Sequence, residues 1–233
     1  MLREDMIDLY ESAASWQSLL ASDDVCLVGG AAASFYAEHR LSIDHDHVVA
    51  DLRGRFEIIL DALESQGDWI TNRLVPGKII LGELDGIEVG IRQLIRKLPL
   101  EVEKAELPSG YRLILPTLDE TLRIKAYLII RRNQTRDYLD VAALASRFGE
   151  RWAAKVLTDI DKYYTDDGSV GDAFASQLVG MLSDPQPLDH GKLDLADYKG
   201  IDEQFQDWDI ISITCRLIAE NIVVGLTGDK SDD

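Results

Sequence analysis

The chain has 233 residues, 46% of them hydrophobic, and a formal net charge of −18. This composition excludes a chain that is disordered throughout, and the acidic balance excludes the general basic surface by which many proteins grip nucleic acid. No stretch approaches the run of about 18 apolar residues that spans a membrane, and the N-terminus carries charges of both signs. We therefore expect neither a membrane span nor a signal peptide, and place the protein in the cytoplasm.

The charge is unevenly distributed along the chain. Residues 159–233 hold 17 acidic and 5 basic residues, a net charge of −12, whereas the rest of the chain carries only −6. Basic residues dominate locally in the segments 92–97 and 123–136. These two segments either line a cleft for a triphosphate or an RNA end, or are ordinary solvated faces.

The first elements follow from the spacing of apolar residues. Apolar residues recur at helical spacing over residues 4–21, which predicts an amphipathic helix whose apolar face is buried against the rest of the protein. A short buried strand is expected at 25–28, a small-residue helix at 31–40 and a second strand at 43–50. Cys26 and Cys215 both stand in apolar segments, which indicates buried reduced thiols rather than a disulfide.

Two aspartates, Asp44 and Asp46, stand one residue apart in the second strand. Side chains at i and i+2 of a strand project from the same face, so both carboxylates are expected side by side. Two carboxylates at about 4 Å repel by roughly 4 kcal/mol at an effective dielectric constant of about 20. A divalent cation converts this repulsion to attraction, and Mg²⁺, which combines a few carboxylates with substrate phosphates, is the candidate.

The pair Gly29-Gly30 between the first strand and the first small-residue helix supplies the other half of the pattern. A residue without a side chain lets the backbone approach a phosphate, and the N-terminus of the following helix favours negative charge. The order of glycines, helix and aspartates therefore predicts a site for a metal ion and a phosphate.

A helix is expected at 53–65, and strands at 69–75, 78–84 and 87–95, with Asp85-Gly86 as a hairpin turn. Glu88 stands between two apolar residues in the last of these strands. It is either a third acid of the metal site or an exposed strand residue opposite the region of Glu83. A proline-flanked loop is expected at 107–116.

A capping box, Thr117-X-X-Glu120, predicts that a helix starts there and continues to Arg132. Lys125 and Arg132 are seven residues apart, so two helical turns bring them onto one face, spaced to meet successive phosphates or exposed for solubility. Asp137 follows at the start of a further helix, where an acid suits the positive end of the helix dipole.

These features resemble the nucleotidyltransferase superfamily, whose signature is Gly-Gly or Gly-Ser, about nine to thirteen residues, and then acid-X-acid. More narrowly, the AbiEii-type family, which includes toxins of toxin-antitoxin and abortive-infection systems, is similar in two blocks. The first is Gly29-Gly30 with the run His39-Arg40-Leu41-Ser42-Ile43-Asp44-His45-Asp46, and the second is Lys125, Arg132 and Arg136-Asp137-Tyr138-Leu139-Asp140. The resemblance covers roughly residues 25–148.

The resemblance implies a role for each matched residue. Asp44 and Asp46 would hold magnesium, and Glu88 would complete the metal site and help to activate the attacking hydroxyl. Contacts to the triphosphate would come from Gly29, Gly30, Ser42, Lys125 and Arg132. Asp137 would orient the lysine or the nucleotide.

The histidines depart from the family pattern, in which apolar residues usually occupy the positions of His45 and His47. Either this face of the strand is less buried, or the imidazoles form hydrogen bonds in the core. A different possibility is that His39, His45 and Asp46 form the metal set of a phosphohydrolase.

The C-terminal half is expected to be mainly helical, with an irregular connector at 184–200 and further helices at 201–224. The expected fold is α/β (α+β), a nucleotidyltransferase-like mixed sheet flanked by helices. The catalytic domain, with its N-terminal helix, would span residues 1–116 and the helical C-terminal domain residues 117–233.

The expected function is metal-dependent transfer of a nucleotidyl group from an NTP to a hydroxyl of RNA (such as tRNA) or protein. The chain is expected to be an enzyme. The resemblance also suggests that it acts as the toxin of a toxin-antitoxin system and binds an antitoxin protein. Two alternatives stay open. One is a catalytically inactive relative that binds partners through its acidic half, and the other is the metal-dependent phosphohydrolase.

Overall fold

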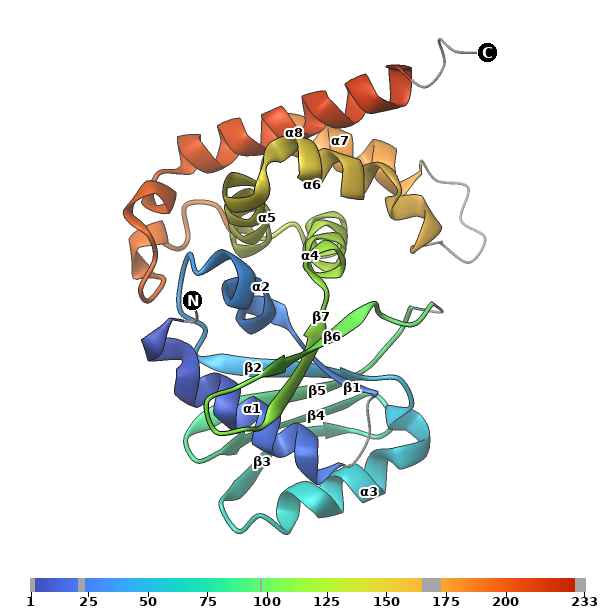
Figure 1. Ribbon diagram of the computed structural model, residues 1–233, viewed down its shortest axis with the longest axis vertical. Coiled ribbons are helices and arrows are strands. Elements are labelled where there is room, and N and C mark those ends of the chain that lie inside the picture. Colours follow the sequence, from blue (N-terminus) through green and yellow to red (C-terminus); the bar gives the residue numbers. More distant parts are fainter. Residues whose placement is uncertain (1–2, 21–23, 97, 165–172, 229–233) are drawn as a thin grey trace. The chain divides into compact units, whose positions relative to one another are not determined.

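The computed structural model describes residues 3–20, 24–96, 98–164 and 173–228. Lys97, the end of one predicted basic segment, and residues 229–233 lie outside this description. The chain divides into two compact units, Met1–Thr117 and Leu118–Asp233 (Figure 1).

The first unit is built around a sheet. Its elements, in chain order, are η1 (Glu4–Met6), α1 (Ile7–Leu19), β1 (Val25–Val28), α2 (Gly29–Ala37), β2 (Asp44–Val49), α3 (Leu52–Glu64), β3 (Trp69–Val75), β4 (Ile79–Leu84), β5 (Ile87–Gln93), β6 (Val102–Glu106) and β7 (Arg112–Pro116).

The main sheet has five strands in the order β1-β2-β5-β4-β3. The β2–β5 pair is parallel and the other pairs are antiparallel, so the sheet is mixed. Strand β2 lies between β1 and β5, with Asp46 opposite Val28 on one side and Gly90 on the other. This register brings the end of β1, where the glycine pair begins, next to the second aspartate.

Two apolar clusters form the core of this unit. Helix α3 packs its apolar stripe on one face of the sheet, together with Trp16 of α1 (Figure 1); the sheet residues of this cluster are Val25, Val49, Ile80, Val89 and Ile91. The second cluster joins α1 to β1, α2 and the β6–β7 hairpin through Tyr10, Leu27, Ala31, Leu113 and Leu115. Helix α1 is therefore fixed against the strands that carry and flank the aspartates.

The second unit is helical. It consists of α4 (Leu118–Arg132), α5 (Thr135–Phe148), α6 (Glu150–Thr158), η2 (Ile160–Lys162), α7 (Phe174–Ser183), η3 (Leu195–Asp197), η4 (Glu203–Gln206) and α8 (Trp208–Gly228). Within this unit α8 packs against α5, α6 and α7 (Figure 1). Among the described residues, no helix of either unit is long and apolar enough to cross a membrane.

The irregular segment before α8 is tied to the turn between α4 and α5. Asn133 in this turn has a positive φ of 48°. Its carbonyl accepts a 2.8 Å hydrogen bond from the Leu188 amide, and its side-chain amide donates a 2.8 Å bond to the Gln186 carbonyl. Asp189 accepts 2.7 and 2.8 Å bonds from the amide and hydroxyl of Thr135, the first residue of α5. The connector thus covers the N-terminus of α5.

The predicted mixed sheet with flanking helices and a helical C-terminal part is confirmed. Several boundaries differ. Helix α2 begins at Gly29 rather than at residue 31, because Gly29 takes a φ of 78° directly after an extended Val28, and it ends where Glu38 turns left-handed at φ 56°. The expected loop at 107–116 is wrong in its second half, since residues 112–116 form β7 and pair with β6. Strand β6 is almost wholly exposed, so its sequence lacks the apolar residues by which a strand is usually predicted.

Candidate functional site

Strand β2 presents two chemically different faces. Along the strand Asp44, Asp46 and Val48 are partly exposed, whereas the alternate residues His45, His47 and Val49 are buried. The two carboxylates therefore lie on one face of the sheet, as the i, i+2 spacing predicts. This is the geometry on which the proposed metal site depends.

The glycine turn lies beside the second aspartate. A methyl group built on Gly29 would stand 3.4 Å from both Cβ and Oδ2 of Asp46. The positive φ of Gly29 favours glycine there, because residues with a Cβ rarely adopt it. Helix α2 starts at this glycine and runs for nine residues, so its first amide groups belong to the glycine turn.

Ser42 contacts both parts of the site. Its hydroxyl donates a 3.0 Å hydrogen bond to Oδ1 of Asp44, and it would lie 3.0 Å from a methyl group on Gly30. The serine is buried, with an exposed fraction of 7%. It therefore connects the first aspartate to the glycine turn and orients one carboxylate oxygen.

Asp46 also has a cationic neighbour. Nε of Arg92 on β5 lies 3.7 Å from Oδ1 of Asp46, and both side chains are partly exposed. Gly90 fills the position beside Asp46 in the parallel register, and a methyl group there would overlap the Asp46 carboxylate. The absence of a side chain at Gly90 thus leaves room for the carboxylate.

Glu88 is placed by register next to the first aspartate. It pairs with Asp44 across β2–β5 and with Glu83 across β4–β5, and it is exposed. Three carboxyl residues therefore stand in one row across three strands. Within the described part of the chain, however, no group of three or more His, Cys, Asp or Glu side chains is arranged to hold a metal ion.

The two histidines of β2 form hydrogen bonds in the core. His45 Nδ1 and His47 Nε2 lie 2.9 Å apart, His47 Nδ1 lies 3.4 Å from Nε2 of Gln17, and His45 Nε2 lies 3.4 Å from the Ser12 hydroxyl. Gln17 in turn bonds both the amide and the carbonyl of Ile114 on β7. This polar chain joins α1, β2 and β7 behind the aspartates.

Burial lowers the pKa of His45 to about 4, against the opposing charge of Asp44, and burial together with His45 holds the pKa of His47 well below its ordinary value. Both rings are therefore neutral near pH 7. Because His45 and Asp46 point to opposite faces of β2, they do not converge on one metal ion. This geometry counts against the phosphohydrolase set of His39, His45 and Asp46.

In the helical unit, the predicted lysine and arginine are each held by a carboxylate. Lys125 is buried, and its Nζ lies 2.6 Å from Oδ2 of the buried Asp140. Arg132 donates two hydrogen bonds of 2.6 Å to the two oxygens of the buried Asp137. The interpretation of Lys125 as a solvated surface cation is wrong, because its side chain is buried and paired with Asp140 of the R-D-x-x-D segment.

Sequence reasoning did not identify the partners of these cations. Asp140 entered only as part of a motif, and Asp137 was expected to orient the lysine or the nucleotide, whereas it binds Arg132. The presence of a second carboxylate, Asp140, one helical turn after Asp137 could have indicated that each of the two cations has its own acidic partner. Glu120, expected in a capping box, is buried and accepts hydrogen bonds from Nε and Nη2 of Arg123.

The chain matches none of the protein-family models. It is 36% identical over 177 residues to the heme uptake protein MmpL11 of Mycobacterium tuberculosis, a match that covers 74% of this chain and 16% of that protein. It is 34% identical over 173 residues to the mycolic acid-containing lipids exporter MmpL11 of Mycolicibacterium smegmatis, with the same coverage of 74% and 16%. The chain thus spans only about a sixth of the length of these curated relatives.

Solved structures resemble this chain over a larger share of their length. The nucleotidyltransferase toxin MenT4 from M. tuberculosis H37Rv aligns with a TM-score of 0.53 at 16% identity, over 92% of this chain and 82% of MenT4. An antigenic nucleotidyltransferase-like protein from Paracoccidioides brasiliensis aligns with a TM-score of 0.46 at 18% identity, over 62% and 78% of the two chains. The likeness to MenT4 shows that this chain has a nucleotidyltransferase fold.

Proposed function

We propose that this protein is a metal-dependent nucleotidyltransferase of the AbiEii type, which moves an NMP group from an NTP to a hydroxyl acceptor. The observation that carries the proposal is the placement of Asp44 and Asp46 on one face of β2, beside the glycine turn that opens α2. A fold shared with MenT4 supports the reaction class. Fold alone does not define a function, so the proposal depends on the site.

The two aspartates fit a hard divalent cation. They offer neighbouring carboxylate oxygens on a partly exposed face, and one of them is already oriented by Ser42. Mg²⁺ is commonly bound by one or two carboxylates, with water and substrate phosphates as its other ligands. Asp44 and Asp46 would hold the ion, with Glu88 as the proposed third acid, and the ion would neutralise charge on the phosphates and the attacking oxygen.

The reaction proceeds by attack of the acceptor hydroxyl oxygen on the α-phosphorus of the NTP. The new oxygen–phosphorus bond forms as the bond to the β-phosphate oxygen breaks, and pyrophosphate leaves with that electron pair. Glu88 is exposed and in register with Asp44, so it is proposed to accept the proton of the hydroxyl. The main contribution of the protein is positioning and charge neutralisation.

The triphosphate is proposed to contact Gly29, Gly30 and Ser42 of the sheet unit. In the helical unit, Lys125 and Arg132 are proposed, from the resemblance, as phosphate-binding residues. Backbone amides at the start of α2 can donate to phosphate oxygens. Asp140 and Asp137 hold the lysine and the arginine in defined orientations. The planar guanidinium of an arginine matches the geometry of phosphate oxygens. An arginine that is already held in one orientation also loses less conformational freedom when it binds phosphate.

The acceptor and the biological setting are further parts of the proposal. MenT4 is a nucleotidyltransferase toxin, and a toxin role with an antitoxin partner is proposed here by analogy. RNA such as tRNA, or a protein hydroxyl, is the proposed acceptor class. The test is incubation of the purified protein with each α-labelled NTP, Mg²⁺ and either total RNA or whole-cell protein.

Asp44→Asn and Asp46→Asn variants are the matched controls, because they keep the shape of each side chain and remove its charge. Label should pass to an acceptor with the parent protein, pyrophosphate should be released in equal amount, and both signals should disappear with either variant. Transfer by a double variant at the parent rate would refute the proposal. Release of orthophosphate without pyrophosphate would instead indicate hydrolysis.

The likeness to MmpL11 supports a second candidate function. The matched proteins are described as a heme uptake protein and a lipid exporter. A chain related to a part of such proteins is proposed to act as a nucleotide- or partner-binding module of a transport assembly, without catalysis. This candidate predicts Mg²⁺-dependent binding of NTP with no release of pyrophosphate in any acceptor mixture.

A further inference from the structure

Helix α8 carries an apolar stripe that the packing of the helical unit leaves exposed. The opposite face of the helix is buried against α5, α6 and α7. The side chains of the stripe are between 37% and 66% exposed, and they are Ile210, Ile213, Leu217 and Val224. An exposed apolar row on one helix is typical of an interaction surface.

The spacing of the stripe is that of a helix that packs along another helix. Its steps of three, four and seven residues repeat the pattern by which two helices interlock their apolar side chains. Residues 210–224 span about 21 Å, since each residue of a helix rises about 1.5 Å. Glu220 stands between Leu217 and Val224 in this row, so it would carry its charge into such a contact.

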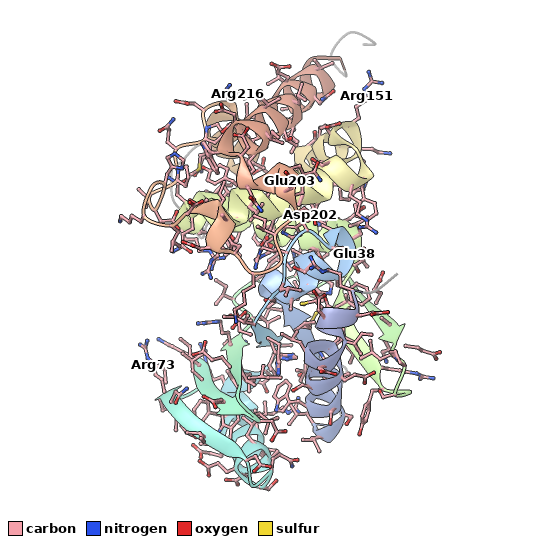
Figure 2. The ribbon with its side chains drawn as sticks, turned by 90° about the vertical axis from the view of Figure 1, so that its left-hand side faces the viewer. Glu38, Arg73, Arg151, Asp202, Glu203 and Arg216 are labelled. Atoms are coloured by element: carbon pink, nitrogen blue, oxygen red, sulfur yellow. The ribbon has the colours of Figure 1, made fainter. Side chains whose placement is uncertain are left out.

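Two charges make the stripe complementary to a second copy of itself. Arg216, which is labelled in Figure 2, and Glu220 are both exposed, and among the described residues neither forms an ion pair. They stand two residues before and two residues after position 218. An antiparallel second helix with its two-fold axis at that level therefore places Arg216 of each copy opposite Glu220 of the other. A parallel pair would bring like charges together, so the antiparallel arrangement is favoured.

The charge around the stripe limits what can cover it. Residues 159–233 carry a net charge of −12, but α8 itself contains only Asp209, Arg216 and Glu220, a net charge of −1. The stripe is thus a nearly neutral strip on an acidic unit. Nucleic acid and anionic membranes would be repelled by the surrounding charge, whereas a second copy of α8 presents an equally neutral apolar surface.

We propose that α8 is the contact helix of a homodimer, in which two copies pack their stripes antiparallel. Leu217 would lie near the centre of the contact, and Ile213 of one copy would lie beside Val224 of the other. One helix pair is smaller than a standard interface of about 800 Å² per partner, so we expect a reversible dimer with a Kd of about 10 µM. This inference goes beyond the proposed function and does not depend on it.

The experiment is sedimentation-equilibrium ultracentrifugation of the full chain over a range of concentrations. Arg216→Glu and Glu220→Arg are the charge variants, together with the double variant that carries both changes, and Leu217→Glu tests the apolar contact. Arg73→Glu is the matched control, because it makes the same charge change at an exposed residue of β3, in the other unit (Figure 2). Thermal melts establish that each variant is folded.

We expect each single charge variant to weaken self-association at least about tenfold, equivalent to about 1.4 kcal/mol, because it places like charges opposite each other twice. The double variant should associate like the parent, since it restores opposite charges between the copies. An equimolar mixture of Arg216→Glu and Glu220→Arg should form a heterodimer, because one copy then carries two acids and the other two arginines. Leu217→Glu should be monomeric, and Arg73→Glu should match the parent.

Two results would overturn the inference and leave the proposed function intact. In the first, the parent stays monomeric up to about 200 µM, where a dimer with a Kd of about 10 µM would be largely formed. If that monomer floats with vesicles of phosphatidylcholine, the stripe contacts lipid instead of a second copy. In the second, the parent dimerises but Leu217→Glu and both single charge variants dimerise equally well, which would assign the contact to another surface.

Discussion

Nζ of Lys125 lies 2.6 Å from Oδ2 of Asp140, and both side chains are buried in the helical unit. Removal of one partner leaves an uncompensated charge in the interior. We expect Asp140→Asn to lower the free energy of unfolding by about 3–5 kcal/mol, measured by urea denaturation. The double variant Lys125→Met, Asp140→Leu should recover most of this loss, because it removes both charges and keeps similar volumes. A single variant as stable as the parent would contradict the interpretation.

A second prediction concerns the space beside Asp46. A methyl group at Gly90 would overlap the Asp46 carboxylate, which can rotate away because it is the end of a flexible side chain. Gly90→Ala should therefore reduce nucleotidyl transfer at least about tenfold, or about 1.4 kcal/mol in activation free energy, with little change in the thermal midpoint.

Gly82→Ala is the matched control for this prediction. A methyl group at Gly82 would overlap the Trp69 ring and the Ile70 carbonyl, so the neighbouring strand itself must move. Here we expect a clear loss of stability, measured by the thermal midpoint. The interpretation of Gly90 is wrong if Gly90→Ala has a lower thermal midpoint than Gly82→Ala.

A third prediction follows from the buried histidines. The pKa of His45 is lowered by burial to about 4, so the folded protein binds fewer protons than the unfolded chain between this value and about pH 6.5. His45 therefore contributes stability above pH 6.5 that is lost as the pH falls toward 4. The expected loss is on the order of 3 kcal/mol, measured by urea denaturation between pH 7.5 and 4.5.

His45→Asn is the control for the pH dependence. Asparagine places a polar atom near the position of Nδ1 but does not titrate, so the variant should show a smaller decrease in stability with falling pH. A parent protein with equal stability at pH 7.5 and pH 5 would show that the imidazoles are not held neutral.

The fourth prediction concerns the start of α5. Burial raises the pKa of Asp189, but the hydrogen bonds from Thr135, together with the backbone amide of Asp189 and the charge of Arg136, leave the pKa below its ordinary value. The carboxylate thus stabilises the fold above about pH 4 and loses this contribution as it is protonated below. Asp189→Ala should lower stability at pH 7 by about 1 kcal/mol, as for the loss of a helix cap. No difference between variant and parent at pH 7 would argue against this role.

Local patterns in the sequence were sufficient for the sheet and for the placement of Asp44 and Asp46. Alternation along β2 and the Asp85-Gly86 turn are short-range signals that the fold preserves. The partners of Lys125 and Arg132 depend on how α4 and α5 pack, which spacing within one helix does not determine.

Other features of the site depend on contacts between distant segments. Arg92 beside Asp46 and Gln17 beside His47 are separated from these residues by tens of positions in the sequence, so only the assembled sheet brings them together. The hairpin of β6 and β7 was missed for a related reason. Its inner strand is buried by packing on α1 and β1, while β6 lies outside with charged side chains.

The strict alternation of carboxylates and imidazoles along β2 also protects the pairing of this strand during folding. A slip of one residue would turn Asp44 and Asp46 toward the apolar interior and both rings toward solvent. Such a misaligned strand would bury two like charges and break the hydrogen bond between Gln17 and His47. The residues proposed for chemistry on one side thus also exclude the wrong alignment of their own strand.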